Sequence, residues 1–185
     1  MGKLQIKGKS TDRIYIPVKY VSHYGKERKV DTIVDTGSNI SYIGISHIKG
    51  LKYQVDLNKL TLNNLIGMYG ITGAIPSPSG KQPKPKPDEK IYASWAVNLK
   101  SIILDDIIIN CPQVYIPVSF CFSGKQELTN IQFEKSNLAL LGTDILRNFN
   151  YGVNINSTPI FTITKPTRNI PPRCLKITHL DFENT

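Results

Sequence analysis

Ile33-Val34-Asp35-Thr36-Gly37-Ser38-Asn39-Ile40-Ser41 is the stretch around which the rest of the chain is organised. β-Branched residues lead into Asp35, a serine follows the glycine, and apolar residues resume at Tyr42 and Ile43. The pattern predicts a strand, an acidic turn and a second strand. Gly37 is expected to supply a positive φ angle in that turn, which glycine adopts without steric penalty. Asp-Thr-Gly alone also fits an ordinary hairpin turn, so the tripeptide by itself leaves the function open.

A second informative stretch, Leu138-Ala139-Leu140-Leu141-Gly142-Thr143-Asp144-Ile145-Leu146, lies far downstream. Apolar residues lead directly into its glycine. Thr143 or Asp144 is then suited to cap a short helix, which the pattern predicts near residues 144–149.

The two stretches together resemble the two motifs of the retropepsin-like aspartic proteases. In that family an apolar strand ends in Asp-Thr/Ser-Gly, a flap hairpin follows, and an apolar-apolar-Gly motif leads into a short helix. The resemblance covers residues 14–164 and implies an all-β protein: a closed β-barrel with a flap hairpin and one short C-terminal helix, one lobe per chain. This chain departs from the pattern at Thr143, where many members have arginine, which puts a buried arginine-mediated dimer contact in doubt.

The resemblance assigns roles to particular residues of the first motif. Asp35 would be the catalytic acid, the Thr36 hydroxyl would brace the partner loop, Gly37 would allow a tight turn, and Ser38 would form hydrogen bonds near the acid. The second motif, which would lie behind the active-site loop, consists of Leu140, Leu141 and Gly142.

Peptide hydrolysis of this kind requires a water molecule activated between two carboxyl groups that share one proton. The chain supplies only one such acid, because the order of Gly142-Thr143-Asp144 is reversed relative to the first motif. The resemblance therefore implies a homodimer in which two Asp35 side chains face each other across a twofold axis. Its partners would be a second copy of the chain and a polypeptide substrate bound as an extended strand.

A flap hairpin is expected between the two motifs, with arms at residues 65–74 and 90–99. An insertion at about residues 75–90 separates the arms and contains a proline-rich segment, residues 76–87, which cannot form sheet because proline lacks a backbone N–H. That segment is interpreted either as a flap extension that selects substrates or as a solvated loop with no direct role. The flap candidates are Tyr69, Gly70, Ile71, Thr72, Gly73 and Trp95.

Length and composition favour one soluble globular domain. The chain has 185 residues, of which 40% are hydrophobic and 20% charged, and it carries a net charge of +9. We expect a domain at residues 1–164 and a tail at residues 165–185. The positive charge is dispersed, and no basic helix or aromatic stripe accompanies it, so nucleic-acid binding is not expected.

Other residue types argue against several further classes of protein. Three cysteines without a close pair suggest neither a disulfide framework nor a zinc site, and the three histidines are scattered, so no metal or cofactor is expected. The sequence shows no signal peptide and no membrane-spanning run, which predicts a cytoplasmic protein with no membrane contact.

The remaining pattern predicts mostly strands and turns. Asp31 is interpreted as an exposed strand residue, and Asp105-Asp106 as a hairpin turn. Residues 90–104 and 113–122 are expected to form strands, residues 151–155 and 159–164 a hairpin, and residues 174–177 an edge strand. Residues 124–136 are expected to be a polar connection.

Three functions remain open at this stage. The first is a homodimeric aspartic endopeptidase. The second is a catalytically silent member of the same fold that binds peptides or mediates assembly, because a fold does not guarantee its chemistry. The third is a basic β domain that binds nucleic acid, which would show salt-dependent binding independent of Asp35.

Overall fold

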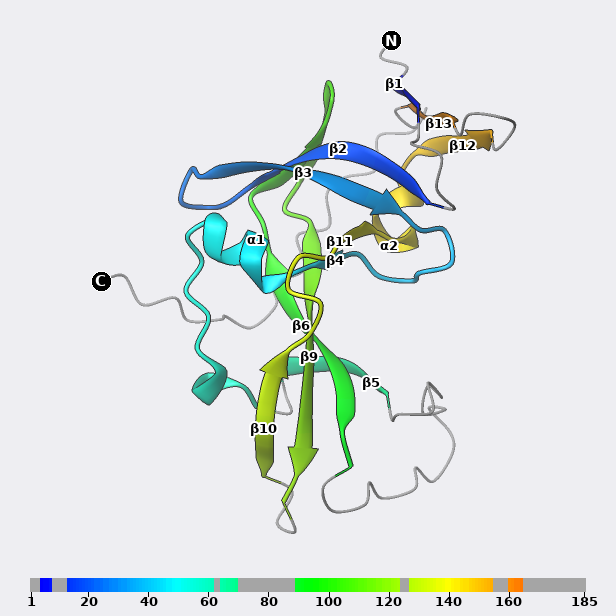
Figure 1. Ribbon diagram of the computed structural model, residues 1–185. Helices are drawn as coiled ribbons and strands as arrows, with labels where there is room; N and C mark the ends of the chain where they lie inside the picture. The colour runs from blue at the N-terminus through cyan, green and yellow to red at the C-terminus, as the bar shows by residue number, and fades with distance from the viewer. Residues whose placement is uncertain are drawn as a thin grey trace.

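The computed structural model describes residues 4–7, 13–61, 64–69, 89–123, 127–154 and 160–164. The described chain is mostly β-strand, with short helices, which confirms the predicted all-β class (Figure 1). Its helical segments are α1 (Ile45–Gly50), the 3₁₀ turn η1 (Leu57–Lys59) and α2 (Thr143–Leu146). Its strands are β1 (Leu4–Lys7), β2 (Ile14–Val21), β3 (Glu27–Val34), β4 (Tyr42–Ile43), β5 (Leu65–Tyr69), β6 (Ile91–Asn98), β7 (Ser101–Leu104), β8 (Ile107–Asn110), β9 (Gln113–Phe122), β10 (Leu128–Phe133), β11 (Ala139–Leu141), β12 (Asn150–Asn154) and β13 (Ile160–Thr164).

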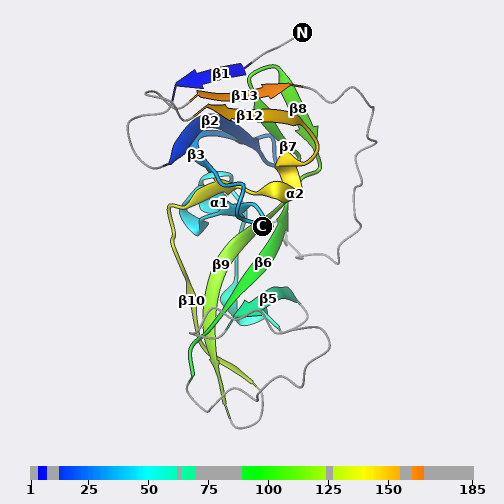
Figure 2. The ribbon, with the colours of Figure 1, turned by 90° about the vertical axis from the view of Figure 1, so that its right-hand side faces the viewer.

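The larger sheet is open rather than closed. Its strands pair in the order β5-β6-β9-β4-β11-β3-β2-β7-β8, with β10 pairing to β9 off this path. The two end strands, β5 and β8, lie at opposite ends of the molecule, so no ladder joins them (Figure 2). The expected closed barrel is therefore wrong for the described residues. Within the sheet, β9 divides one of its edges between β4, at Tyr115, and β10, at residues 118–122.

A smaller sheet joins the two ends of the described chain. β13 lies between β1 and β12 and pairs antiparallel to both. The β12–β13 pair confirms the predicted hairpin, whereas β1 was not predicted from the sequence. Four residues are too few for alternation to identify a strand.

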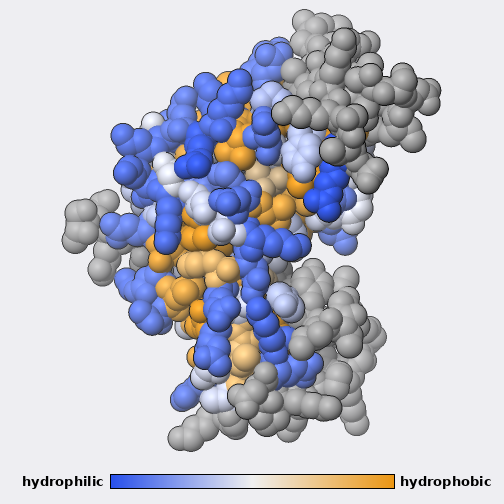
Figure 3. Space-filling view, viewed as in Figure 1, coloured by the Kyte–Doolittle hydropathy of each residue, from blue (hydrophilic) through white to orange (hydrophobic). Residues whose placement is uncertain are grey.

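Alternating side chains place one face of the large sheet in the core. In β9 the buried positions Val114, Ile116 and Val118 alternate with less buried ones, which is the period of a strand. β3 does not show this alternation at its start, where its first three residues are all exposed (Figure 3). Asp31 in this strand is exposed, as predicted.

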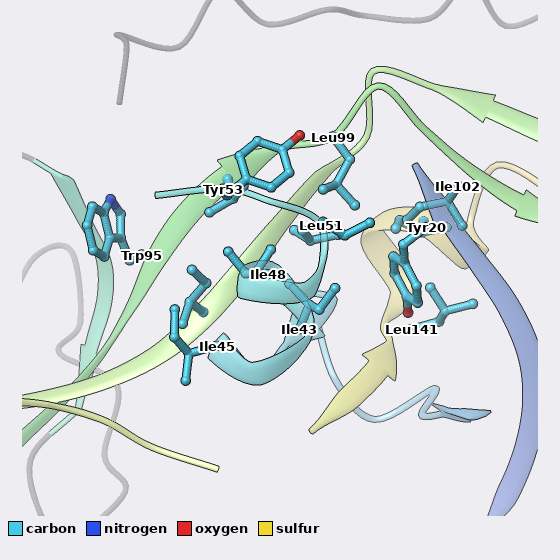
Figure 4. Packing of buried hydrophobic residues seen from close by; sticks show 14 of the residues in the cluster. Tyr20, Ile43, Ile45, Ile48, Leu51, Tyr53, Trp95, Leu99, Ile102 and Leu141 are labelled. Atoms are coloured by element: carbon cyan, nitrogen blue, oxygen red, sulfur yellow. The ribbon is translucent and has the colours of Figure 1, made fainter. Parts of the chain in front are cut away.

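The core is centred on α1 and the strands around it. Ile43, Ile48 and Leu51 group at this helix, with Tyr20 and Leu141 on neighbouring strands (Figure 4). The Tyr20 hydroxyl is within 3.0 Å of Thr32 Oγ1, and both side chains are buried. Burial raises the pKa of Tyr20 well above its ordinary value of 10.0.

Two sequence predictions about strands need correction. The single strand expected over residues 90–104 is two strands, β6 and β7, because the buried positions change phase between Leu99 and Ile102. The polar connection expected at residues 124–136 contains β10, whose six residues lack a fully buried position and so give little hydrophobic signal. The turn at Asp105-Asp106 is confirmed, and Asp105 has a positive φ angle of 55°.

Within the described ranges, no helix is both long and apolar enough to cross a membrane. The edge strand expected at residues 174–177 lies outside the described residues.

Candidate functional site

The two sequence motifs lie side by side in the structure. β11 runs between β3 and β4, parallel to the first and antiparallel to the second. Leu140 pairs with Ile33 on one side and with Tyr42 on the other, while Leu141 pairs with Val34. The loop after β3 leaves the sheet and returns to β4 next to β11 and α2 (Figure 1). The two segments therefore meet at the turn that carries Asp35.

Asp35 begins a compact turn at the end of β3. Its N–H donates to the Leu141 carbonyl at 3.0 Å, which continues the β3–β11 pairing by one residue. Its Oδ1 accepts the N–H of Gly37 at 2.9 Å, and its carbonyl accepts the N–H of Ser38 at 3.3 Å. The Asp35 side chain is partly exposed, and Thr36 beside it is exposed. The backbone N–H of Gly37 thus holds the Asp35 carboxyl group in place, and the group remains accessible.

Gly37 contributes to the turn by leaving room for the Asp35 side chain and not by adopting a special backbone angle. The prediction of a positive φ was wrong, since Gly25 is the described glycine that has one. A Cβ added at Gly37 would lie 3.2 Å from Asp35 Oδ1. That separation is tighter than an ordinary van der Waals contact, so a side chain here would press on the carboxylate.

Gly142 allows close approach between two backbones. A Cβ at this position would lie 2.4 Å from the Ile40 carbonyl oxygen and 2.9 Å from the Ser38 carbonyl oxygen. Any side chain would therefore displace the loop that carries Asp35.

Residues 143 and 144 contact the loop instead of capping the helix. Gly142 is the N-cap of α2 and makes no side-chain capping hydrogen bond, so the predicted cap was wrong. Thr143 donates twice to the Ser38 carbonyl, from its N–H at 2.8 Å and its Oγ1 at 3.1 Å. Asp144 accepts from the Ser41 hydroxyl at 2.6 Å and from the Ser41 N–H at 3.0 Å.

The Ser38 hydroxyl acts within the loop. It donates to the Ile40 carbonyl at 2.7 Å. It therefore stabilises the path of the loop rather than binding the Asp35 carboxyl group directly. Ser41 and Asp144 were not identified as a pair from sequence, because a contact over 103 positions leaves no local pattern.

A row of half-buried residues crosses the sheet next to this loop. The pairing registers connect Tyr15 to Ile33, Ile33 to Leu140, Leu140 to Tyr42, and onward through β9 to β6. Ile33 is two residues before Asp35, so β-strand alternation directs both to one face of the sheet. We call this row the half-buried band; its members are Tyr15, Ile33, Leu140, Tyr42, Tyr115 and Ala96.

Polar contacts orient two tyrosines of the half-buried band. The Tyr42 hydroxyl accepts from Ser94 Oγ at 3.2 Å, and the Tyr115 hydroxyl donates to Gln113 Oε1 at 2.8 Å. Burial raises the pKa of Tyr115, and the charges of Asp144 and Tyr42 raise it further. Tyr115 and Asp144 therefore lie close enough to interact electrostatically.

The expected flap is described only in its arms. β5 and β6 form an antiparallel pair in which Leu65 faces Trp95 and Tyr69 faces Tyr92. Trp95 is 2% exposed and belongs to the hydrophobic core, so it is not a surface residue of the arm. The flap candidates Gly70, Ile71, Thr72 and Gly73 lie outside the described residues.

The described side chains offer no cluster for a metal ion. No group of three or more His, Cys, Asp or Glu side chains in these ranges could hold one.

The overall fold, in which β11 pairs with β3 and β4 beside the Asp35 loop, matches a retropepsin-like fold. The crystal structure of a retropepsin-like aspartic protease from Rickettsia conorii is similar to this chain, with a TM-score of 0.50 and 14% sequence identity. The match covers 88% of this chain and 90% of that chain. No protein-family model matches the sequence, and no curated protein matches it. At this identity the likeness establishes the fold, and the chemistry has to be argued from the residues themselves.

Proposed function

We propose that the protein is an aspartic endopeptidase that is active as a homodimer. The observation that carries the proposal is the environment of Asp35, a partly exposed carboxylate at a turn braced by the second motif. A hairpin turn with no further role would not need a glycine such as Gly142 pressed against its backbone. The retropepsin-like fold supports the same conclusion.

The chemistry follows from pairing two copies of Asp35 across a twofold axis. Two carboxyl groups held close together share one proton, because both cannot ionise at once. The ionised member removes a proton from a bound water, which attacks the peptide carbonyl carbon, while the protonated member donates to the carbonyl oxygen. The C–N bond of the resulting tetrahedral diol then breaks as the newly protonated carboxyl group donates its proton to the leaving nitrogen and the other carboxylate takes back a proton from the diol. The apparent pKa values then belong to the pair rather than to either residue.

The half-buried band supports a substrate with large apolar side chains. Its residues lie on the Asp35 face of the sheet, and their partial exposure leaves apolar area that a bound peptide would cover. Thr36 is exposed, which supports a contact between this residue and a second copy of the loop in the dimer. We therefore expect cleavage next to aromatic or aliphatic residues in an extended polypeptide.

Cleavage of a diverse peptide mixture by the wild type and by Asp35→Asn tests this function. Mass spectrometry of the products at several protein concentrations and across about pH 4 to 8 gives both activity and specificity. We expect cleavage that vanishes in Asp35→Asn and rises more than linearly with wild-type concentration. Unchanged cleavage in the variant would exclude the proposed role of Asp35. A folded, dimeric wild type that binds peptides without cleaving them would instead indicate the catalytically silent binding module.

A further inference from the structure

Three consecutive residues at the start of α2 hold the Asp35 loop from within the same protomer. Gly142 donates its N–H to Ser41 Oγ at 2.9 Å. Thr143 holds the Ser38 carbonyl through two donors, and Asp144 holds Ser41 through both carboxylate oxygens. The loop is therefore fixed at two points, Ser38 and Ser41.

The Ser41 hydroxyl has little freedom in this arrangement. Its oxygen accepts from the Gly142 N–H and its proton goes to Asp144 Oδ1, and Ser41 is fully buried. The Ser41 carbonyl also accepts the N–H of Tyr115, which ties the loop to β9. A buried hydroxyl that both donates and accepts a hydrogen bond resists rotation, because any other orientation would leave a buried polar group unpaired.

Asp144 is the charged member of this network. Its Oδ1 accepts from Ser41 Oγ and from the Ile145 N–H at 2.8 Å, and its Oδ2 accepts from the Ser41 N–H. The ion pairs found in the described ranges are Lys19–Glu27 and Lys90–Glu134, neither of which includes it. Its hydrogen bonds go instead to Ser41 and to the adjacent N–H, and hydrogen bonds to an ionised acceptor are shorter and stronger than neutral ones.

We propose that Asp144 is a positioning residue for catalysis, which orients the Asp35 loop through Ser41. The inference rests on the proposed function, and it adds that the loop is ordered before dimerisation rather than by it. Thr143 adds contacts to Ser38 that also lie within one protomer. The contact that holds the catalytic loop is thus supplied by residues 142–144 of the same chain.

Steady-state kinetics of Asp144→Asn, Ser41→Ala and the double variant test the proposal. Asparagine preserves the shape of the side chain, but it has one acceptor oxygen and one donor NH₂ group. One of the two Ser41 donors, the N–H or the hydroxyl, would then face a donor and lose its acceptor. We expect kcat to fall about tenfold or more with KM changed by less than about threefold, because a displaced catalytic group affects the transition state more than substrate binding. The double variant should lose no more than the worse single variant, because both changes remove one interaction. Asp106→Asn, at the exposed turn between β7 and β8, is the matched control and should retain kcat.

Amide hydrogen exchange gives a second readout that does not require activity. Ser41 and Gly142 should exchange faster in Asp144→Asn than in the wild type or Asp106→Asn, at protein concentrations both below and above dimer formation. Unchanged kcat in Asp144→Asn, an equal fall of kcat in Asp106→Asn, or protection that appears only in the dimer would overturn the proposal. If the wild type does not cleave peptides, the proposed function fails, whereas the exchange result still decides whether Asp144 orders the loop.

Discussion

At the scale of single residues, the candidate site depends on two glycines that act in different ways. Gly37 leaves room for the Asp35 carboxylate, and Gly142 leaves room for the backbone of the loop. A Cβ added at Gly37 would meet a side-chain oxygen, whereas a Cβ added at Gly142 would meet backbone carbonyl groups, which cannot rotate away. Substitutions at the two positions should therefore have different consequences.

Gly142→Ala should destabilise the protein and remove activity. The added methyl group would meet the Ile40 carbonyl at 2.4 Å, so the loop or β11 must shift. Overpacking of this kind destabilises by about 1–3 kcal/mol. Urea unfolding measures the change, and Gly152→Ala is the matched control, because a Cβ there meets no atom within 4 Å. Equal unfolding midpoints for both variants would contradict the described packing.

Gly37→Ala should reduce activity with a smaller effect on folding. Its Cβ would press on Asp35 Oδ1 at 3.2 Å, and Gly37 is exposed, so the main effect is to displace the carboxylate. We expect kcat to fall about tenfold or more while the free energy of unfolding changes by less than about 1 kcal/mol. A variant with wild-type kcat would show that the carboxylate does not need the position seen here.

The two motifs could be located from sequence because each is a local pattern. Asp35-Thr36-Gly37 and the apolar run into Gly142 are each contained in a few positions, so both could be found and expected to meet. The pair Ser41–Asp144 could not, because each residue fits its own neighbourhood as a loop serine or a helix-start aspartate. The proposed catalytic role of Asp35 stays a prediction until cleavage is measured.

At the scale of elements, an ion pair joins the start of β6 to the end of β10. Lys90 Nζ lies 2.7 Å from Glu134 Oε1, which also accepts from Ser119 Oγ at 2.6 Å. The hydrogen bond from Lys90, followed by that from Ser119, holds the pKa of Glu134 below its ordinary value of 4.5. The same hydrogen bond raises the pKa of Lys90 above 10.5. Together with Ser119, the pair therefore links β6, β9 and β10 at any pH at which Lys90 and Glu134 are both charged.

Glu134→Gln should lower stability in a pH-dependent way. A carboxyl group with a lowered folded-state pKa contributes stability above pH 4.5, and that contribution disappears as the pH falls through the folded-state value. The Lys90 contribution is present below pH 10.5 and is lost above it. The urea midpoints of wild type and variant should differ slightly at about pH 7, because the pair is partly exposed, and should converge as the pH falls below 4.5 through the folded-state value.

Glu27→Gln provides the control for this experiment. Its partner Lys19 lies 3.3 Å away, and both side chains are more exposed than those of the Lys90 pair. Its effect on the midpoint should be smaller at every pH. A pH-independent difference for Glu134→Gln would contradict the ion-pair interpretation.

Strand prediction depended on how clearly buried positions alternate. β9 was found with its observed bounds because apolar residues recur at every second position of its sequence, from Val114 to Phe122. β10 was missed because its buried and exposed positions alternate only weakly. β6 and β7 were merged into one predicted strand because apolar residues continue past Leu99, where the alternation of buried positions shifts by one residue. Alternation also cannot report how far a sheet curves, which is why the open sheet was not foreseen.

At the scale of the whole molecule, one chain holds half of the proposed catalytic pair. The described residues contain one Asp-Thr-Gly turn, with its carboxylate and the neighbouring Thr36 on an accessible surface. A water activated by two carboxyl groups then requires a second protomer, and a twofold axis is the arrangement that supplies the same residue twice. Neither composition nor strand pattern predicts such an assembly; it follows from the count of acids that the chemistry needs.

Mixing wild type with Asp35→Asn tests the central claim most directly. Peptide cleavage is measured at fixed total protein concentration while the fraction of the variant increases, after confirming that both proteins unfold at the same urea concentration. If the active site is shared, an equal mixture retains about a quarter of the wild-type rate, because only dimers with two wild-type protomers have the complete pair. A rate of about half, in proportion to the wild-type chains present, would mean that each protomer works alone and would contradict the account.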